Sequence, residues 1–208
     1  MPLLEVENLT VVYPTRTGKF TAVRDVSFAV EAGEILGIVG ESGAGKSTIS
    51  TAIMRLIDYP GFIEAGSVRM NGQDLMALSD DRMQKVRGKR IGVIFQDPLT
   101  APNPVLTVGF QIMETVRLHL GLSGEALRAR AVELLRQVGI PDPEHRVSQY
   151  PHQFSGGMRQ RVVIALALAG EPDLLLADEP TTALDVSIQS EILQLIQTLC
   201  RERQLGVV

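Results

Sequence analysis

Residues 40–47 carry the most specific chemical signal in the sequence. They read GESGAGKS, which matches the pattern G-x-x-x-x-G-K-[ST] throughout. Glycines allow backbone N–H groups to turn inward around phosphates, and a helix that begins there adds the positive end of its dipole. Lys46 would supply a cation for the β- and γ-phosphates, and the Ser47 hydroxyl would bind Mg²⁺. The residues expected to surround the phosphates are Gly40, Glu41, Ser42, Gly43, Ala44, Gly45, Lys46, Ser47 and Thr48.

The competing interpretation of this segment is a glycine-rich turn that contains Gly-Lys-Ser by chance. The context argues against it, because a near-continuous apolar run at 35–39 precedes the glycines and a helical pattern over 46–57 follows them. A buried strand, a phosphate-binding turn and a helix form half of a βα unit.

Two adjacent carboxylates end another apolar run. Asp178 and Glu179 follow the segment LLLA at 174–177. Ligands of open α/β sheets bind at the carboxyl ends of the parallel strands. Asp178 would therefore hold Mg²⁺, directly or through water, and Glu179 would orient and polarise an attacking water. Taken alone, the pair fits the start of a surface loop equally well, and the phosphate motif favours the functional interpretation.

A second glycine motif consists of Ser155, Gly156 and Gly157. It precedes a helical stretch that continues to Ala169. Serine is a favoured N-cap residue, and the glycines leave the first N–H groups of the helix exposed. By itself, this pattern is typical of an ordinary helix start with a flexible entry.

Taken together, these motifs resemble the nucleotide-binding subunits of ATP-binding cassette (ABC) proteins. The resemblance extends over the whole chain and implies an ATPase whose subunits pair head to tail. One ATP would lie between the phosphate loop of one subunit and the Ser-Gly-Gly helix of the other. The motifs occur in the family's order: the phosphate loop at 40–47, Gln96 after a strand, Ser-Gly-Gly at 155–157, Asp178-Glu179 and Ala-Leu-Asp at 183–185.

The resemblance also implies roles for individual residues. Gln96 would sense Mg²⁺ and the water, and would link the site to a membrane partner. Asp185 would shape the partner subunit's site. Tyr13 would stack on adenine, although a surface tyrosine on a strand is the plainer alternative. The implied catalytic residues are Glu179, Gln96 and Lys46, and the implied Mg²⁺ ligands are Ser47, Gln96 and Asp178.

A narrower resemblance points to the dipeptide, oligopeptide and nickel importer ATPases. It rests on residues 95–104, on residues 150–161 and on Gly-Glu-Ser-Gly at 40–43, although Ala101 and Pro102 replace the serine and leucine usual there. It implies a peripheral protein on the cytoplasmic face of the inner membrane that energises import of di- or oligopeptides, or of nickel or another solute. The implied partners are a second ABC ATPase subunit, identical or different, two transmembrane permease subunits and, indirectly, a solute-binding protein, without nucleic acid.

The remaining patterns describe the elements that position these motifs. Alternation of apolar and polar residues predicts antiparallel strands at 4–7, 26–30 and 67–70. Near-continuous apolar runs predict parallel strands, covered on both faces, at 35–39, 91–95 and 174–177. Helical spacing predicts helices over 110–120, 127–138 and 188–199, and residues 205–208 resemble the beginning of a strand.

These elements predict an α/β fold. The expected architecture is a P-loop NTPase core, with a mostly parallel sheet and flanking helices, plus an N-terminal antiparallel β subdomain and an inserted α-helical subdomain. We expect residues 1–208 to form a single ABC nucleotide-binding domain that is truncated at its C-terminus. Residues 1–97 and 155–208 would form the ATP-binding core, and residues 98–154 the helical subdomain.

Composition excludes several other classes of protein. The 208 residues are 45% hydrophobic and 21% charged, as in ordinary globular domains. A net charge of −4 provides no basic footprint for nucleic acid, and a single cysteine excludes a disulfide framework. The N-terminus lacks the pattern of a signal peptide, and the longest apolar run, 162–169, is too short to span a bilayer.

The resemblance further implies a histidine on the strand after the acidic pair and its helix. The sequence ends at Val208, inside that strand, so we expect a chain that binds ATP but hydrolyses it poorly. His119, His145 and His152 fall in or beside the helical region, where surface or packing roles are expected.

A short basic run precedes the apolar segment at 91–95. So short a run favours a solvated face over contact with an acidic partner or lipid headgroups. It comprises Arg82, Lys85, Arg87, Lys89 and Arg90.

Three other functions compete with transport. A cassette ATPase acting on DNA or ribosomes would carry coiled-coil insertions, tandem cassettes or basic extensions, which this sequence lacks. A GTPase or small-molecule kinase would leave Ser-Gly-Gly unexplained, and a GTPase would carry an Asn/Thr-Lys-x-Asp motif. An interaction module that keeps nucleotide as a structural ligand remains an alternative for this chain.

Overall fold

An antiparallel sheet occupies the N-terminal part of the computed structural model, which describes residues 1–95, 101–182 and 184–208. Its strands follow the order β2-β1-β3-β4. The predicted strands at 4–7, 26–30 and 67–70 are confirmed, and Val6 pairs with both Phe28 and Val68. The elements here are β1 (Leu4–Thr15), β2 (Gly18–Val30), helix α1 (Lys46–Ile53), β3 (Phe62–Met70) and β4 (Gln73–Asp74).

A parallel sheet of β5 (Ile91–Ile94), β6 (Leu174–Ala177) and β7 (Gly206–Val207) lies between two hydrophobic cores. Side chains alternate across a strand, so neighbouring residues of β6 enter different cores. Leu174 and Leu176 pack with the antiparallel strands and α1, whereas Leu175 packs with the helices of the opposite face. Both faces are therefore covered, as the apolar runs at 91–95 and 174–177 predict.

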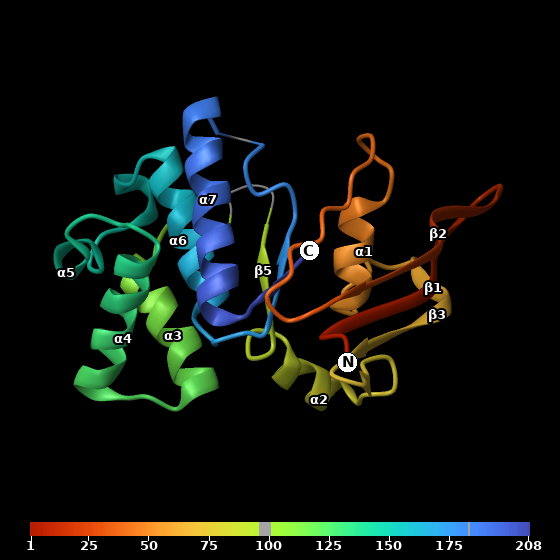
Figure 1. Ribbon diagram of the computed structural model, residues 1–208, viewed down its shortest axis with the longest axis horizontal. Helices are drawn as coiled ribbons and strands as arrows, with labels where there is room; N and C mark the ends of the chain where they lie inside the picture. The colour runs from red at the N-terminus through yellow and green to blue at the C-terminus, as the bar shows by residue number, and fades with distance from the viewer. Residues whose placement is uncertain (96–100, 183) are drawn as a thin grey trace.

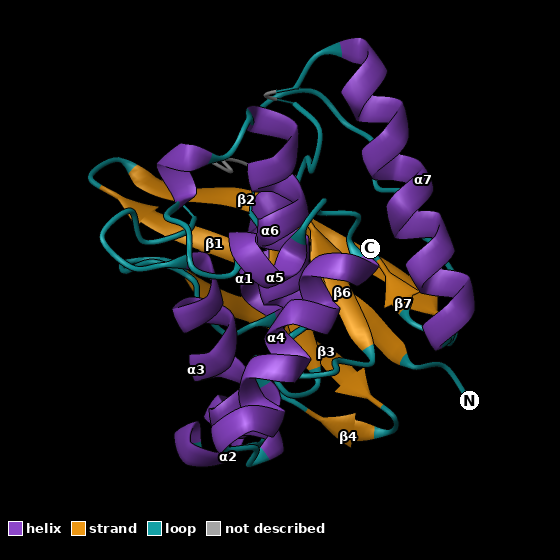
Figure 2. Ribbon diagram, turned by 90° about the vertical axis from the view of Figure 1, so that its left-hand side faces the viewer, coloured by secondary structure: helices purple, strands orange, loops and turns teal. Residues whose placement is uncertain are grey.

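Helices cover the second face of the parallel sheet. The helices predicted over 110–120, 127–138 and 188–199 are confirmed. In Figure 1 these helices lie on one side of β5, with α1 and the antiparallel strands on the other, and Figure 2 shows α3–α6 in front of the strands. They are α3 (Val108–Leu120), α4 (Gly124–Gln137), α5 (Pro143–Arg146), a 3₁₀ turn (Pro151–Gln153), α6 (Gly156–Leu168) and α7 (Val186–Arg203).

The predicted parallel strand at 35–39 is wrong. Only Ile35 makes a bridge, to Val207, and the adjoining hydrogen bonds join Leu36 N to Val207 O and Val207 N to Glu34 O. Because β7 is two residues long, it offers ladder partners to residues 34–36 alone. Val39 is 96% exposed, so this apolar run is not buried as predicted.

Two further differences concern helices. Helix α1 ends at Ile53 rather than at 57, because Arg55 adopts a left-handed backbone with φ +52°. Helix α2 (Asp80–Val86) was not predicted, although Ser79 and two acidic residues precede a lysine in a pattern typical of a short helix. Two of the basic residues near it are structural: Arg87 Nε donates to Met54 O at 2.8 Å, and Arg90 pairs with Asp173.

Close packing between α6 and β5 depends on Gly92. A Cβ atom at this position would lie 2.4 Å from the carbonyl oxygen of Ala167. We therefore expect Gly92→Ala to lower the free energy of unfolding by about 2 kcal/mol, measured by urea denaturation. The control is Gly37→Ala, whose Cβ meets no atom within 4 Å, and which should change stability by no more than roughly 0.5 kcal/mol. Equal stability of the two variants would contradict this account of the packing.

The described helices include none that is both long and apolar enough to cross a membrane.

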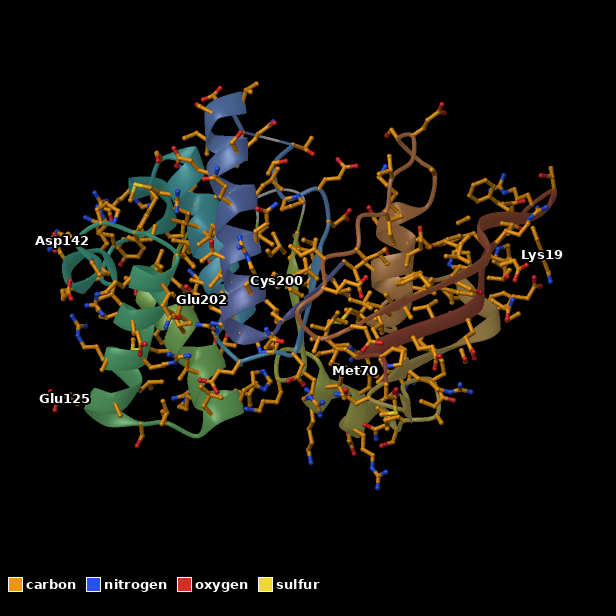
Figure 3. All side chains as sticks on the ribbon, in the orientation of Figure 1. Lys19, Met70, Glu125, Asp142, Cys200 and Glu202 are labelled. Atoms are coloured by element: carbon orange, nitrogen blue, oxygen red, sulfur yellow. The ribbon has the colours of Figure 1, made fainter. Side chains whose placement is uncertain are left out.

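Cys200, labelled in Figure 3, is buried on α7, and its Sγ donates to Leu205 O at 3.1 Å. Burial raises the pKa of this thiol. The cysteine is therefore part of the packing between α7 and β7.

Candidate functional site

The phosphate loop closes on itself before α1 begins. Ala44 N donates to Glu41 O at 3.1 Å, and Gly43 and Gly45 have φ of +80° and +90°. A Cβ at position 45 would lie 2.3 Å from Ala22 O of β2. Glycine is thus required here both by the backbone conformation and by the close approach of a neighbouring strand. Helix α1 follows at once, with its N-terminus at the loop.

Lys46 turns its side chain back into the loop. Its Nζ donates to Gly40 O at 2.9 Å and to Glu41 O at 3.0 Å, and lies 3.5 Å from Oε1 of Glu179. The side chain is 20% exposed. One partly buried cation therefore joins the phosphate loop to the acidic end of β6.

A cavity of about 270 Å³ opens over this loop. Six of the nine residues predicted to surround phosphates line it, and so do Tyr13 and Glu179. Phe20 of β2, which no sequence motif singles out, pairs with Tyr13 across the β1–β2 hairpin. The signal that could have found it is a second aromatic residue in the facing strand. The lining residues are Tyr13, Phe20, Ala22, Ser42, Gly43, Gly45, Lys46, Ser47, Thr48 and Glu179.

Tyr13 is held at the cavity by a glycine. A Cβ on Gly61 would lie 2.4 Å from Cε1 of Tyr13 and 2.7 Å from Cγ2 of Ile57. The ring therefore packs directly on the backbone of the segment that leads into β3. The side chain of Tyr13 is half-buried, and its stacking on adenine stays a prediction beside the surface-tyrosine alternative.

The acidic pair lies at the carboxyl end of β6. Asp178 N donates to Ile94 O at 3.0 Å, which extends the pairing with β5. Glu179 has φ +45°, a conformation that is uncommon for a residue with a side chain and that recurs at functional sites. Thr182 donates twice to Glu179: its Oγ1 to Oε2 at 3.0 Å and its N to the carbonyl oxygen at 3.2 Å. These bonds fix a turn that aims the carboxylate at the cavity.

The structure does not bring the Ser-Gly-Gly motif to this cavity. Ser155 caps α6, as its side chain accepts from Met158 N at 3.4 Å, and Ser155 and Gly156 are exposed. Figure 1 shows α6 and α1 on opposite sides of β5. Gly157 is required by packing, because a Cβ there would lie 2.8 Å from Cγ2 of Ile188. Within one chain, the phosphate loop and the Ser-Gly-Gly motif therefore lie at separate places on the surface.

Two residues of the predicted motifs, Gln96 and Ala183, lie outside the described residues. Asp185 is the N-cap residue of α7 and is exposed. No sequence motif singles out Gln160, which is 1% exposed and whose Nε2 donates to Pro180 O at 2.7 Å. The only signal for Gln160 in the sequence was its position in the segment 150–161, shortly after Ser-Gly-Gly.

The histidines lie away from the cavity, as predicted. His145 and His152 are exposed. His119 packs on Gly88, where a Cβ would lie 2.5 Å from its Nε2. Burial, and then the charge of Lys89, lower the pKa of His119. Among the residues that the structure describes, no three His, Cys, Asp or Glu side chains gather as a metal site would require.

Comparison with known proteins shows relatives of this chain. The oligopeptide transport ATP-binding protein OppD of Bacillus subtilis is 55% identical over 207 residues, which is 99% of this chain and 58% of OppD. The dipeptide transport ATP-binding protein DppD of Escherichia coli is 51% identical over 208 residues, all of this chain and 64% of DppD. The chain thus spans about three-fifths of the length of these curated relatives.

Solved structures agree with the fold. The ATP-binding cassette MJ0796, in a dimeric post-hydrolysis state bound to ADP and Pi, superposes with a TM-score of 0.85 at 33% identity, over 99% of this chain and 86% of that one. CbiO1 of Clostridium perfringens, part of an ABC transporter complex, gives a TM-score of 0.82 at 27% identity, over 99% and 76% of the two chains. The family model described as ABC transporter matches residues 23–182. The chain, with its phosphate loop, its acidic strand end and its Ser-Gly-Gly helix, belongs to the ABC transporter family.

Proposed function

We propose that this chain binds ATP at the phosphate loop and hydrolyses it as the energy-coupling subunit of a peptide importer. The observation that carries the proposal is the distance of 3.5 Å between Lys46 Nζ and Glu179 Oε1. One cavity thereby combines a cation suited to phosphates with a carboxylate suited to act on water.

The triphosphate would lie along residues 40–48, where the glycines permit N–H groups to face it and α1 contributes its N-terminus. Lys46 would exchange its bonds to the carbonyl oxygens of Gly40 and Glu41 for phosphate oxygens. Adenine would stack on Tyr13, with Phe20 beside it.

Magnesium fits the donor set of this site. Ser47 lines the cavity, and Asp178 follows β6 beside Glu179. The hydroxyl of one and the carboxylate of the other are hard oxygen ligands of the kind that Mg²⁺ prefers. Gln96, outside the described residues, is proposed as a further ligand. When bound, Mg²⁺ would neutralise charge on the phosphates.

Glu179 would act as the general base. Its carboxylate would accept a proton from water while the water oxygen forms a bond to the γ-phosphorus and the bond from that phosphorus to the departing ADP oxygen breaks. The Thr182 hydroxyl would hold the carboxylate in place, and Lys46 would stabilise the charge on the transferred group.

A second subunit would complete each site. Ser155 and Gly156 are exposed at the start of α6, and the first N–H groups of this helix would bind a γ-phosphate held by another subunit. Asp185, exposed at the start of α7, would shape the partner's site. The related cassette MJ0796 is dimeric, which supports the proposal that two subunits pair.

The proposed partners follow from the relatives, which are named for dipeptide and oligopeptide transport. The ATPase would bind two permease subunits from the cytoplasmic face of the membrane, and a solute-binding protein would deliver the peptide. ATP would act by shifting the populations of two permease conformations, so the peptide would never contact this chain.

Copurification tests the transport proposal. The complete gene product is tagged, expressed in its native cell and purified from gently solubilised membranes with ATP and without Mg²⁺. Two polytopic membrane proteins and an ATPase subunit, identified by mass spectrometry, are the expected result. Ribosomal or DNA-repair proteins without any membrane protein would overturn transport and leave the ATP site standing.

Tyr13 gives a prediction for nucleotide affinity. Tyr13→Ala should raise the Kd for ATP about tenfold, because base–aromatic stacking contributes about 1–3 kcal/mol. Tyr13→Phe is the matched control and should keep the wild-type affinity, since it retains the ring. Isothermal titration calorimetry measures both constants. An unchanged Kd for Tyr13→Ala would show that adenine binds elsewhere.

A further inference from the structure

Gln160 of α6 is unusual for a polar residue because it is almost fully buried. It is 1% exposed and is the one buried polar or charged side chain in the ranges that the structure describes. Its Oε1 accepts no hydrogen bond from the described residues. An apolar side chain of similar volume would avoid that unpaired acceptor, so packing alone does not account for glutamine here.

The hydrogen bond that Gln160 donates is to the residue that follows the proposed catalytic Glu179. Its Nε2 donates to Pro180 O at 2.7 Å. A carbonyl oxygen only accepts hydrogen bonds, which fixes the orientation of the amide. Pro180 immediately follows Glu179, whose φ of +45° must be maintained by its surroundings.

A second glutamine holds the rest of the same turn. Gln189 of α7 donates from Nε2 to Thr181 O at 3.2 Å and to Leu184 O at 3.0 Å. Backbone carbonyls after Glu179 are thus bound by side chains of two different helices. Gln160 differs from Gln189 in lying on the helix that starts with the Ser-Gly-Gly motif.

We propose that Gln160 is a positioning residue that holds Glu179 and links its placement to the Ser-Gly-Gly end of α6. The inference rests on the proposed function, in which that helix end contacts ATP held by the partner subunit. Helix α6 is continuous from Gly156 to Leu168, so a movement of its start carries the Gln160 amide with it. The hydrogen bond to Pro180 passes that movement to the backbone of Glu179. Nucleotide at one site of the dimer thereby adjusts the base at the other.

The test compares Gln160→Leu with Gln194→Leu, the same change at an exposed glutamine of α7. In the complete gene product with MgATP, Gln160→Leu should lower kcat about tenfold or more and bring the Hill coefficient for ATP toward 1. The Kd for ATP should stay within about twofold of wild type, because the phosphate loop lies on another element. Gln194→Leu should match wild type in all three quantities.

A purely structural role would lower kcat, ATP affinity and the melting temperature together, and that result would overturn the inference. So would a kcat within about twofold of wild type. If Gln160→Leu fails to fold, Gln160→Met fills the volume with a more adaptable side chain that also lacks the donor, and it should show the same selective loss of kcat. Failure of the wild-type protein to bind or hydrolyse ATP would overturn the proposed function itself.

Discussion

Replacing Lys46 by methionine is expected to weaken ATP binding about 100-fold while leaving the protein folded. Lys46 Nζ lies inside the loop, where it donates to two carbonyl oxygens at 2.9 Å and 3.0 Å, and it would exchange these bonds for phosphate oxygens. A charge-assisted hydrogen bond to a charged partner contributes about 1.5–3 kcal/mol, and methionine keeps the length of the side chain without the charge. The loss should therefore appear in binding rather than in stability.

Equilibrium binding of a fluorescent ATP analogue measures this effect, and thermal unfolding checks the fold. Lys85→Met is the matched control, since Lys85 is an exposed lysine on α2. It should bind ATP as the wild type does. An unchanged affinity in Lys46→Met would mean that the phosphates do not lie in the loop at 40–48, and the proposed site would have to be abandoned.

The features that the sequence predicts well are those encoded locally. The phosphate loop is one example, because Gly43 and Gly45 have positive φ, a local backbone conformation that glycine adopts readily. The strand at 174–177 is another example. Four consecutive apolar residues predict a strand covered on both faces, and the two carboxylates that follow mark its carboxyl end. Such signals need no knowledge of distant contacts.

The features that the sequence fails to predict depend on partners far along the chain. The run at 35–39 is as apolar as 174–177, yet strand formation requires a ladder, and β7 offers partners only to residues 34–36. The burial of Gln160 is also not predicted, because a polar residue in a helix is expected at the surface. Its burial results from the packing of α6 against the turn after β6.

Replacing Glu179 by glutamine is expected to lower ATP hydrolysis about 100-fold or more while ATP binding is retained. Glutamine preserves the size of the side chain and can still accept from the Thr182 hydroxyl, now 3.0 Å from Oε2, but it cannot take a proton from water. The change also removes a negative charge 3.5 Å from Lys46 Nζ, which frees the lysine for phosphates. ATP affinity should therefore be equal to or higher than that of the wild type.

Because hydrolysis would no longer remove the γ-phosphate, the head-to-tail dimer should accumulate when Glu179→Gln is given ATP. Light scattering coupled to size-exclusion chromatography measures the dimer, and phosphate release measures hydrolysis in the complete gene product. Glu125→Gln is the control; Glu125 is exposed on α4 and lies at the far end of the helical side in Figure 3. Wild-type hydrolysis by Glu179→Gln would remove the base from the mechanism. If Glu179→Gln hydrolyses ATP slowly but forms no dimer, Glu179 would remain the base and the head-to-tail pairing would be rejected. The carboxylate would then act in a site that one chain completes alone.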